Sequence, residues 1–245
     1  MKDNHTIYGI RAVMEAIKAN QPINRVYLQK GLKGELYKEL ETSIRKHGVS
    51  LSYVPIEKLN RLTRNHHQGA IAQISPVDFY NFEALVEQVI EKEKLPLFLL
   101  LDQVSDVRNF GAIIRTAECC GVHGIIVPKT GSAPITEDTV KTSAGAVFKV
   151  PIAKVDHLKD AIYYLQASGI DIVAATEKTE AEIYNVDLDR PTAIVMGSEE
   201  KGISPSILGI VDHKAGLPLL GRIGSLNVSV ACGVFLYEVV RQRRK

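Results

Sequence analysis

The sequence predicts an α/β protein made of a small basic domain and a larger one built on a mostly parallel sheet. In residues 96–245, short apolar runs alternate with helical patterns, which is typical of a parallel sheet covered by helices on both faces. Residues 1–78 show a shorter alternation of the same kind. The length of 245 residues fits between one and two domains.

Charge is divided unevenly between the two parts. Residues 1–80 contain 12 Lys and Arg against 7 Asp and Glu, a net of +5, although the whole chain carries only +2. A basic small domain beside a slightly acidic larger one favours a module that binds a polyanion next to a module that does chemistry. Ordinary surface variation explains the same charge equally well.

Cysteine use and hydropathy exclude several classes of protein. Cys119, Cys120 and Cys232 cannot form a disulfide framework and lack the spacing of a zinc site. We therefore expect no metal and a reduced, cytoplasmic protein, with Cys119 and Cys120 as small core residues. The polar segment 1–8 is no signal peptide, and the longest apolar run, 95–101, is too short to span a bilayer.

The basic domain, residues 1–78, is expected to form a compact α/β unit. Apolar spacing predicts, in chain order, a helix at 10–17, a strand at 25–28, a helix from Leu36 to near Gly48, a strand at 51–54, a short helix opened by Pro55 and a strand at 70–74. The polar, helix-prone residues 79–95 are expected to link the two domains and to end before Pro96.

The larger domain, residues 96–245, alternates more clearly. The pattern predicts strands at 97–101, 124–127, 172–175, 193–196 and 215–217, and helices at 111–120, 157–168 and 226–241. In open parallel sheets, ligands bind outside the carboxyl ends of the strands. The loops that follow these strands are therefore the places to look for chemistry.

The first loop, residues 102–117, follows the strand at 97–101. Asn109 stands where a helix N-cap is expected. Gly111 and Arg115 are four residues apart and share a helix face, so the glycine would leave room for a substrate group above a guanidinium suited to phosphate. Taken alone, a surface arginine paired with Glu118 is the better interpretation.

The second loop, residues 197–204, follows the strand at 193–196. Gly197 and Gly202 have the spacing of a phosphate loop, but the Lys and Ser/Thr of a Walker loop are missing, and Glu199 and Glu200 would repel a triphosphate. Gly197 at the strand end is interpreted as allowing a ligand close to the backbone. A plain strand-to-helix turn fits as well.

The third loop, residues 218–229, precedes the last helix. Ser225 is a good N-cap for that helix, and Asn227 is expected in its first turn. Free backbone N–H groups at a helix start form a site for a polar or anionic ligand. No Gly-x-Gly-x-x-Gly follows any strand, so a conventional dinucleotide site is not expected. Glycine-bearing loops at three strand ends indicate one composite pocket.

Together the three loops resemble the SpoU (TrmH-like) class of the SPOUT superfamily, which are RNA ribose 2′-O-methyltransferases. The matching residues are Asn109, Gly111, Ile113, Arg115, Thr116 and Ala117 in the first loop, Gly197, Glu199 and Gly202 in the second, and Ser225 to Ser229 in the third. The segment 141–146 also looks like the family. Stretches 7–13 and 67–70 resemble its ribosomal-protein-L30e-like substrate-binding domain.

The resemblance covers essentially the whole chain and has several implications. It implies a trefoil-knotted catalytic domain over 96–245, an L30e-like domain over 1–78, a homodimer, S-adenosylmethionine as cofactor and RNA as substrate. The chain looks most similar to bacterial 23S rRNA guanosine 2′-O-methyltransferases acting on the peptidyl-transferase loop. It departs at Val107, where many members have proline. A tRNA or another rRNA site, or a catalytically silent ribosome-assembly factor, stay open.

The resemblance also assigns residues to roles. It places the cofactor against Met196, Gly197, Leu217, Ser225 and Leu226, and the ribose and phosphate against Asn109, Arg115, Glu199, Ser225 and Asn227. The family's proposed base is Arg115, yet a guanidinium does not normally lose its proton. Arg115 would then clamp a phosphate and stabilise the developing alkoxide, with Glu199 as the other proton acceptor.

The densest basic cluster of the small domain is the last candidate. Arg61, Arg64 and His67, with His66 between them, are expected to touch RNA. A solvated basic face with His67 packed structurally is an equally good interpretation.

Overall fold

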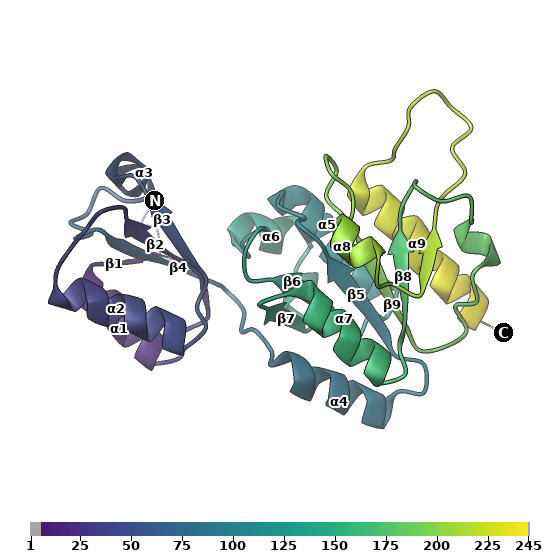
Figure 1. Cartoon of the computed structure of the whole chain (residues 1–245), viewed down its shortest axis with the longest axis horizontal. Helices are drawn as coiled ribbons and strands as arrows, with labels where there is room; N and C mark the ends of the chain where they lie inside the picture. The colour runs from purple at the N-terminus through teal and green to yellow at the C-terminus, as the bar shows by residue number, and fades with distance from the viewer. Residues whose placement is uncertain (1–5, 245) are drawn as a thin grey trace. The chain divides into compact units, whose positions relative to one another are not determined.

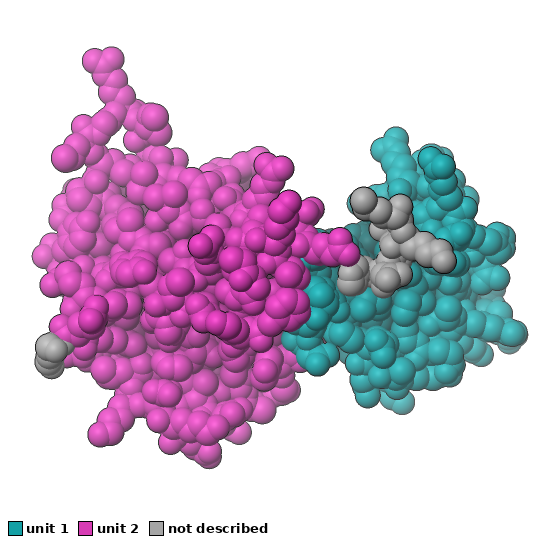
Figure 2. Space-filling view, turned by 180° about the vertical axis from the view of Figure 1, so that it is seen from behind, with its two compact units in different colours: residues 1–78, 134–136 teal, residues 79–133, 137–245 magenta. Residues whose placement is uncertain are grey.

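The computed structural model of the protein describes residues 6–244. The chain divides into two compact units: unit 1 comprises residues 1–78 and 134–136, and unit 2 comprises residues 79–133 and 137–245 (Figure 2). The division falls after Asp78. Each unit has its own apolar core.

Unit 1 is a four-stranded mixed sheet with three helices. Its elements are β1 (Thr6–Tyr8), α1 (Ile10–Lys18), β2 (Ile23–Gln29), α2 (Glu35–Lys46), β3 (Leu51–Val54), α3 (Ile56–Leu62) and β4 (Ala70–Ile74). The strand order is β1-β4-β2-β3. β4 runs antiparallel to β1 and β2, and β2 pairs in parallel with β3.

The core of unit 1 lies between the sheet and helices α1 and α2. Apolar side chains at helical spacing, such as Val13 and Ile17 on α1, pack with Val26 and Leu28 on β2. α3 contributes Leu59 to a second, smaller cluster. The segment 134–136 joins this unit through Ile135, whose backbone N–H and C=O both bond the amide side chain of Asn24, at 3.1 and 2.7 Å.

Unit 2 is a three-layer α/β structure. Its strands are β5 (Leu97–Leu101), β6 (Gly124–Pro128), β7 (Ile152–Val155), β8 (Asp171–Ala175), β9 (Thr192–Met196) and β10 (His213–Ala215). Its α-helices are α4 (Phe82–Lys92), α5 (Val107–Cys119), α6 (Glu137–Thr142), α7 (Leu158–Ala167), α8 (Pro205–Leu208) and α9 (Val228–Arg243), with 3₁₀ turns η1 (Ala146–Phe148) and η2 (Ile183–Asn185).

The sheet of unit 2 is parallel throughout. Its order is β10-β8-β9-β5-β6-β7, and every neighbouring pair is parallel, which confirms the predicted α/β class with a mostly parallel sheet. Strands β5, β6 and β9 are buried along their whole length. α4, α7 and α8 pack on one face, and α5 and α9 lie against each other on the other (Figure 1). The predicted linking helix α4 thus belongs to the core of unit 2.

Several element boundaries differ from the sequence prediction. β1 and β7 were not expected, and the last strand is 213–215 instead of 215–217; all three lie at a sheet edge. α5 begins four residues early because the Asp106 carboxylate caps it, accepting the backbone N–H of Asn109 at 2.8 Å. The assignment of Asn109 as N-cap was therefore wrong: Asn109 lies in the first helical turn.

Candidate active site

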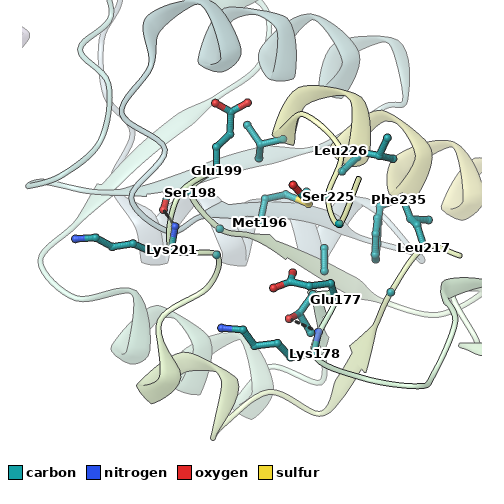
Figure 3. Close-up of a pocket in the computed structure, with 18 of the residues that line it drawn as sticks. Glu177, Lys178, Met196, Ser198, Glu199, Lys201, Leu217, Ser225, Leu226 and Phe235 are labelled. Atoms are coloured by element: carbon teal, nitrogen blue, oxygen red, sulfur yellow. Dashed lines mark hydrogen bonds between the residues drawn. The ribbon is translucent and has the colours of Figure 1, made fainter. Parts of the chain in front are cut away.

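A cavity of about 440 Å³ opens at the carboxyl ends of β8, β9 and β10, beside the start of α9 (Figure 3). All five residues expected to hold the cofactor line it: Met196, Gly197, Leu217, Ser225 and Leu226. Phe235 and Ala231 of α9 complete an apolar wall. In Figure 3, Met196 lies between Glu199 of the second loop and Glu177, which follows β8.

The second loop is closed on itself by its backbone. Ser198 and Gly202 exchange two backbone hydrogen bonds of 3.1 and 2.9 Å. A Cβ on Gly197 would overlap the backbone of Gly202 and Ile203. The absence of a side chain at 197 therefore serves the loop's own closure, and the interpretation that Gly197 admits a ligand close to the backbone stays a prediction.

Asp102 ties the first loop to the second, and the sequence reasoning missed it. Its buried carboxylate accepts the backbone N–H of Ser204 at 2.7 Å, and its own N–H donates to the carbonyl of Met196 at 2.8 Å. The available signal was an acidic residue directly after a buried strand, at the end where loops meet.

The third loop ends at the cap of α9. Asn227, and not Ser225, is the N-cap: its Oδ1 accepts the backbone N–H groups of Ser229 at 3.0 Å and Val230 at 3.4 Å. The predicted capping by Ser225 was wrong because the helix starts two residues later than the sequence pattern indicated. Ser225 instead lines the cavity.

The Asn227 side chain joins all three loops. Its Nδ2 donates to Oδ1 of Asn109 at 3.0 Å and to Oε1 of Glu199. Both of its amide protons and its oxygen are thus used, which fixes the orientation of the amide. Asn109, Glu199 and Asn227 form one polar cluster next to the cavity, which we call the asparagine–glutamate cluster.

Arg115 stands apart from that cluster. It is exposed on α5, and within residues 6–244 its guanidinium makes no hydrogen bond or ion pair. The alternative partner, Glu118, pairs with Lys149 at 3.3 Å. The expected space above the guanidinium was wrong: Gly111 faces Thr142 of α6, whose side chain fills it. Arg115 is therefore a free cation on the surface of unit 2.

The loop after β8 contributes to the site and was also missed. Thr176, Glu177 and Lys178 line the cavity across from the second loop. The strand at 172–175 was expected, so the rule that ligands gather at strand ends could have found them.

The predicted RNA-contact cluster is only partly exposed. Arg61 and Arg64 are solvent-exposed. His67 is 8% exposed; its Nε2 lies 2.9 Å from Oδ1 of Asn60, and its Nδ1 accepts the N–H of Gly69 at 3.0 Å. With both ring nitrogens bonded inside unit 1, His67 fits the structural alternative better than an RNA contact.

The three cysteines of the chain differ in burial. Cys119 is exposed, contrary to the prediction, whereas Cys120 and Cys232 are buried. Burial raises the pKa of Cys120 to about 11, so its thiol stays protonated at neutral pH.

Over residues 6–244, no group of three or more His, Cys, Asp or Glu is arranged to hold a metal ion. In the same span no helix is long and apolar enough to cross a bilayer.

Residues 96–237 match the sequence model of the SpoU rRNA Methylase family, and residues 6–80 match the model for RNA 2′-O ribose methyltransferase substrate binding. The chain belongs to the SpoU/TrmH family of RNA methyltransferases. A Staphylococcus aureus protein that is named as a TrmH family tRNA/rRNA methyltransferase is 37% identical over 98% of this chain and 97% of its own length. A Bacillus subtilis protein with the same family name is 33% identical over 97% of this chain and 95% of its own length.

Solved structures of SpoU enzymes share the fold. The AviRb methyltransferase of Streptomyces viridochromogenes with AdoMet superposes with a TM-score of 0.61 at 22% identity, over 97% of this chain and 90% of that one. An AdoMet-bound rRNA methyltransferase from Sinorhizobium meliloti superposes with a TM-score of 0.62 at 24% identity, over 97% of this chain and 87% of that one. Both of these proteins hold AdoMet, S-adenosylmethionine, which carries a methyl group on a sulfonium sulfur.

The cavity fits this cofactor in size and chemistry. Its volume lies in the range of small-molecule sites. Apolar side chains such as Met196, Leu226 and Phe235 suit an adenine ring, and the backbone at Gly197 offers polar groups without a side chain in the way. These residues would hold the cofactor, leaving the asparagine–glutamate cluster for the acceptor.

Proposed function

We propose that this protein transfers a methyl group from S-adenosylmethionine to a ribose 2′-hydroxyl of RNA. The observation that carries the proposal is the position of Asn227, which bonds Asn109 and Glu199 and thereby unites three loops beside the cavity. Amide and carboxylate groups there can hydrogen-bond a ribose hydroxyl, and a carboxylate can accept its proton. The match of unit 1 to a family model for ribose methyltransferase substrate binding supports the same acceptor.

The reaction requires alignment and removal of a proton. Alignment of the oxygen, methyl carbon and sulfur can supply about 7–11 kcal/mol, and a positioned base adds about 100- to 10,000-fold. Asn109, Ser225 and Asn227 would orient the ribose. Arg115 would clamp the adjoining phosphate and stabilise the alkoxide, and Glu199 and Arg115 are the two candidates for accepting the proton.

We further propose a guanosine in the peptidyl-transferase loop of 23S rRNA as the target. Structural neighbours that combine both units include an rRNA methyltransferase, which covers 97% of this chain. The TrmH/SpoU tRNA modifying enzyme of A. aeolicus covers only 65% of this chain. Unit 1 would thus serve rRNA selection. An RNA substrate of this kind also places the protein in the cytoplasm.

A trefoil knot in unit 2 and a homodimer complete the proposal. Gln242 and Arg243 at the end of α9 bond the backbone of residues 186–190, so the last helix packs on a segment that precedes β9; this supports the knot. Val230 and Tyr237 expose apolar surface on α9, at 54% and 56%. A second copy packed on α9 would cover it.

Methylation of tRNA is the second candidate function. The A. aeolicus tRNA modifying enzyme is 33% identical to the matched part of this chain, a higher identity than the two AdoMet-bound structures have. The same pocket and asparagine–glutamate cluster would serve both substrates. The distinction rests on what unit 1 binds.

Mass-spectrometric mapping of ribose methylation in RNA from cells with and without this gene tests the proposal. Loss of one 2′-O-methylguanosine from the peptidyl-transferase loop is the expected result. Unchanged 23S rRNA with a methylation missing from tRNA digests would support the second candidate. If neither RNA changes, the methyltransferase proposal fails, and a silent ribosome-assembly role takes its place.

A further inference from the structure

One face of the sheet in unit 1 has little helical cover. Side chains alternate between the two faces of a strand, and α1 and α2 pack on the face that carries Val26 and Leu28. On the opposite face, among the helices of unit 1, only the short α3 packs, through Leu59 (Figure 1). The part of that face beyond α3 carries Thr6, Tyr8, Arg25 and Gln73, and we call these four residues the open face.

The open face is polar and continuous across three strands. Thr6 of β1 lies opposite Gln73 of β4, and Gln73 lies opposite Arg25 of β2. These three side chains are partly exposed, and Tyr8 is 39% exposed. A sheet face that packs against a second layer buries apolar side chains. A polar row across neighbouring strands instead suits water or a polar ligand.

Positive charge is concentrated on the same side of unit 1. Lys58 and Arg61 of α3, Arg64 of the next loop and Arg25 of the open face stand against one acidic residue of α3, Glu57. The helices of the other face mix the two signs almost evenly, with Arg11, Glu15, Lys18, Glu35, Lys38, Glu39, Glu41, Arg45 and Lys46.

The cations on this side are available to a ligand. Within residues 6–244, Arg25, Arg61 and Arg64 make no hydrogen bond or ion pair. By contrast, Lys18 on the helical face pairs with Glu15 at 2.9 Å. Charge complementarity therefore favours a polyanion on the open face and α3, and not on α1 and α2.

Aromatic rings lie among these cations. Tyr8 presents its ring next to the row, and Tyr27 lies two residues after Arg25 on the same strand face, with Lys58 Nζ 5.5 Å from its ring centre. Aromatic and guanidinium planes stack on bases, but only where bases are unpaired and can be splayed out. A duplex would offer this surface its backbone alone.

We propose that the open face and α3 bind a single-stranded segment of the substrate RNA. A base stacks on Tyr8, Arg25 contacts a neighbouring base or phosphate, and Lys58, Arg61 and Arg64 follow the phosphates. This inference rests on the proposed function and adds the secondary structure of the RNA that unit 1 selects. It also replaces His67 by the sheet as the centre of the RNA contact.

Two charge-matched triple variants test the electrostatic part. Arg25→Gln/Lys58→Gln/Arg61→Gln removes charge from the proposed surface, and Arg11→Gln/Lys38→Gln/Lys46→Gln removes the same charge from the helical face. Filter binding of the full-length protein to a transcript of the 23S peptidyl-transferase loop is measured over a salt series. The first variant should lower the slope of log affinity against log salt by about 2, and the second should leave it unchanged. Equal slopes for both variants would overturn the proposal.

Substitutions of Tyr8 test the stacking part. Tyr8→Leu should weaken binding about tenfold, whereas Tyr8→Phe should bind like the wild type, because stacking needs the ring and not the hydroxyl. An unstructured RNA should compete better than a duplex of equal length. Preference for the duplex, or equal binding by both Tyr8 variants, would contradict the single-stranded assignment.

The measurements distinguish a failure of the proposed RNA-binding surface from a failure of the proposed methyl-transfer function. Thermal unfolding and S-adenosylmethionine affinity of every variant should match the wild type, which excludes misfolding. If the wild type methylates RNA but the first triple variant binds it normally, the surface is wrong and the function stands. If the wild type neither binds nor methylates RNA, the proposed function fails first.

Discussion

The second and third loops border the same cavity but are held in different ways. Residues 197–204 close through paired backbone hydrogen bonds and a contact that only glycine permits at 197. Residues 218–226 make no backbone hydrogen bond within the described part of the chain, and Leu220 and Ile223 are 101% and 79% exposed. One loop is a preformed wall, and the other has apolar side chains with nothing to cover them.

The steric demands on the glycines of the two loops differ in the same way. Gly197 is required by steric contact, whereas nothing lies within 4 Å of a Cβ at Gly221. The wall formed by the second loop can therefore bind the cofactor without reorganisation. The third loop is the part free to change when the cofactor binds.

Gly197→Ala should have the largest effect on cofactor binding. The added Cβ must displace the backbone of Gly202 and Ile203, so the wall opens and S-adenosylmethionine affinity falls more than about tenfold, at a cost of about 1–3 kcal/mol in packing strain. Gly221→Ala is the control and should bind the cofactor normally. Isothermal titration calorimetry measures both; similar losses in the two variants would remove the contrast between the loops.

Arg115→Ala separates chemistry from both loops. Because Arg115 lies outside the cavity lining and has no partner within residues 6–244, cofactor affinity should not change. Methyl transfer should fall by at least about 100-fold through loss of charge stabilisation. Arg108→Ala, also exposed on α5, should keep its activity. Loss of cofactor binding in Arg115→Ala would show that its assigned role is wrong.

Substitutions of Asn227 test how the end of the third loop is anchored. Asn227→Ala loses the helix cap, which is worth about 1 kcal/mol, and should lower the melting temperature by about 2–4 °C. Asn227→Asp keeps the accepting oxygen but loses the donor to Asn109 and sets a carboxylate against Glu199. Asn227→Asp should keep a higher melting temperature than Asn227→Ala and still lose methyl transfer activity. Equal activity in Asn227→Asp and wild type would exclude the asparagine–glutamate cluster from the reaction.

Limited proteolysis compares the two loops directly. Arg222 lies in the third loop and Lys201 in the second, and both are exposed. Trypsin should cut after Arg222 first, since only that loop lacks backbone hydrogen bonds, and S-adenosylmethionine should slow the cut. Mass spectrometry of the fragments identifies the site. Earlier cleavage after Lys201 would reverse the assignment of rigid and free loops.

The smallest effect concerns the pH dependence of unit 2 as a whole. Burial lowers the pKa of His123, whose Nδ1 accepts the N–H of Leu97 at 3.0 Å, and Glu93 partly opposes the shift. The unfolded chain therefore binds a proton that the folded one resists, so stability is lost as pH falls below about 6.5. His123→Asn should flatten this loss in urea unfolding at several pH values. An unchanged pH profile would assign the loss to other groups.

Sequence reasoning located the inner strands because burial on both faces makes them continuous apolar runs. The strand at 97–101 was placed at its true bounds. The edge strands β1, β7 and β10 were missed or shifted, because an edge strand is short and can carry polar residues such as Lys154, His213 and Lys214. Periodicity does not register such segments.

The candidate site was predictable as a set of loops but not as a network. All five expected cofactor residues line one cavity because carboxyl ends of neighbouring parallel strands converge. The helix caps were misplaced by two or three residues, since spacing alone cannot choose between Asp106 and Asn109, or between Ser225 and Asn227, all of which are good cap residues. That Asn227 bonds Asn109, 118 positions away, depends on tertiary packing and not on any local pattern.

Methyl transfer by the purified protein shows whether the acceptor is a ribose hydroxyl and whether Asn227 takes part. Wild type and Asn227→Asp are incubated with S-adenosylmethionine and a transcript of the 23S peptidyl-transferase loop, and product nucleosides are identified by mass spectrometry. We predict 2′-O-methylguanosine with the wild type and at least about 100-fold less with the variant, at equal cofactor occupancy. A methyl group on a base, or equal product from both proteins, would contradict the account.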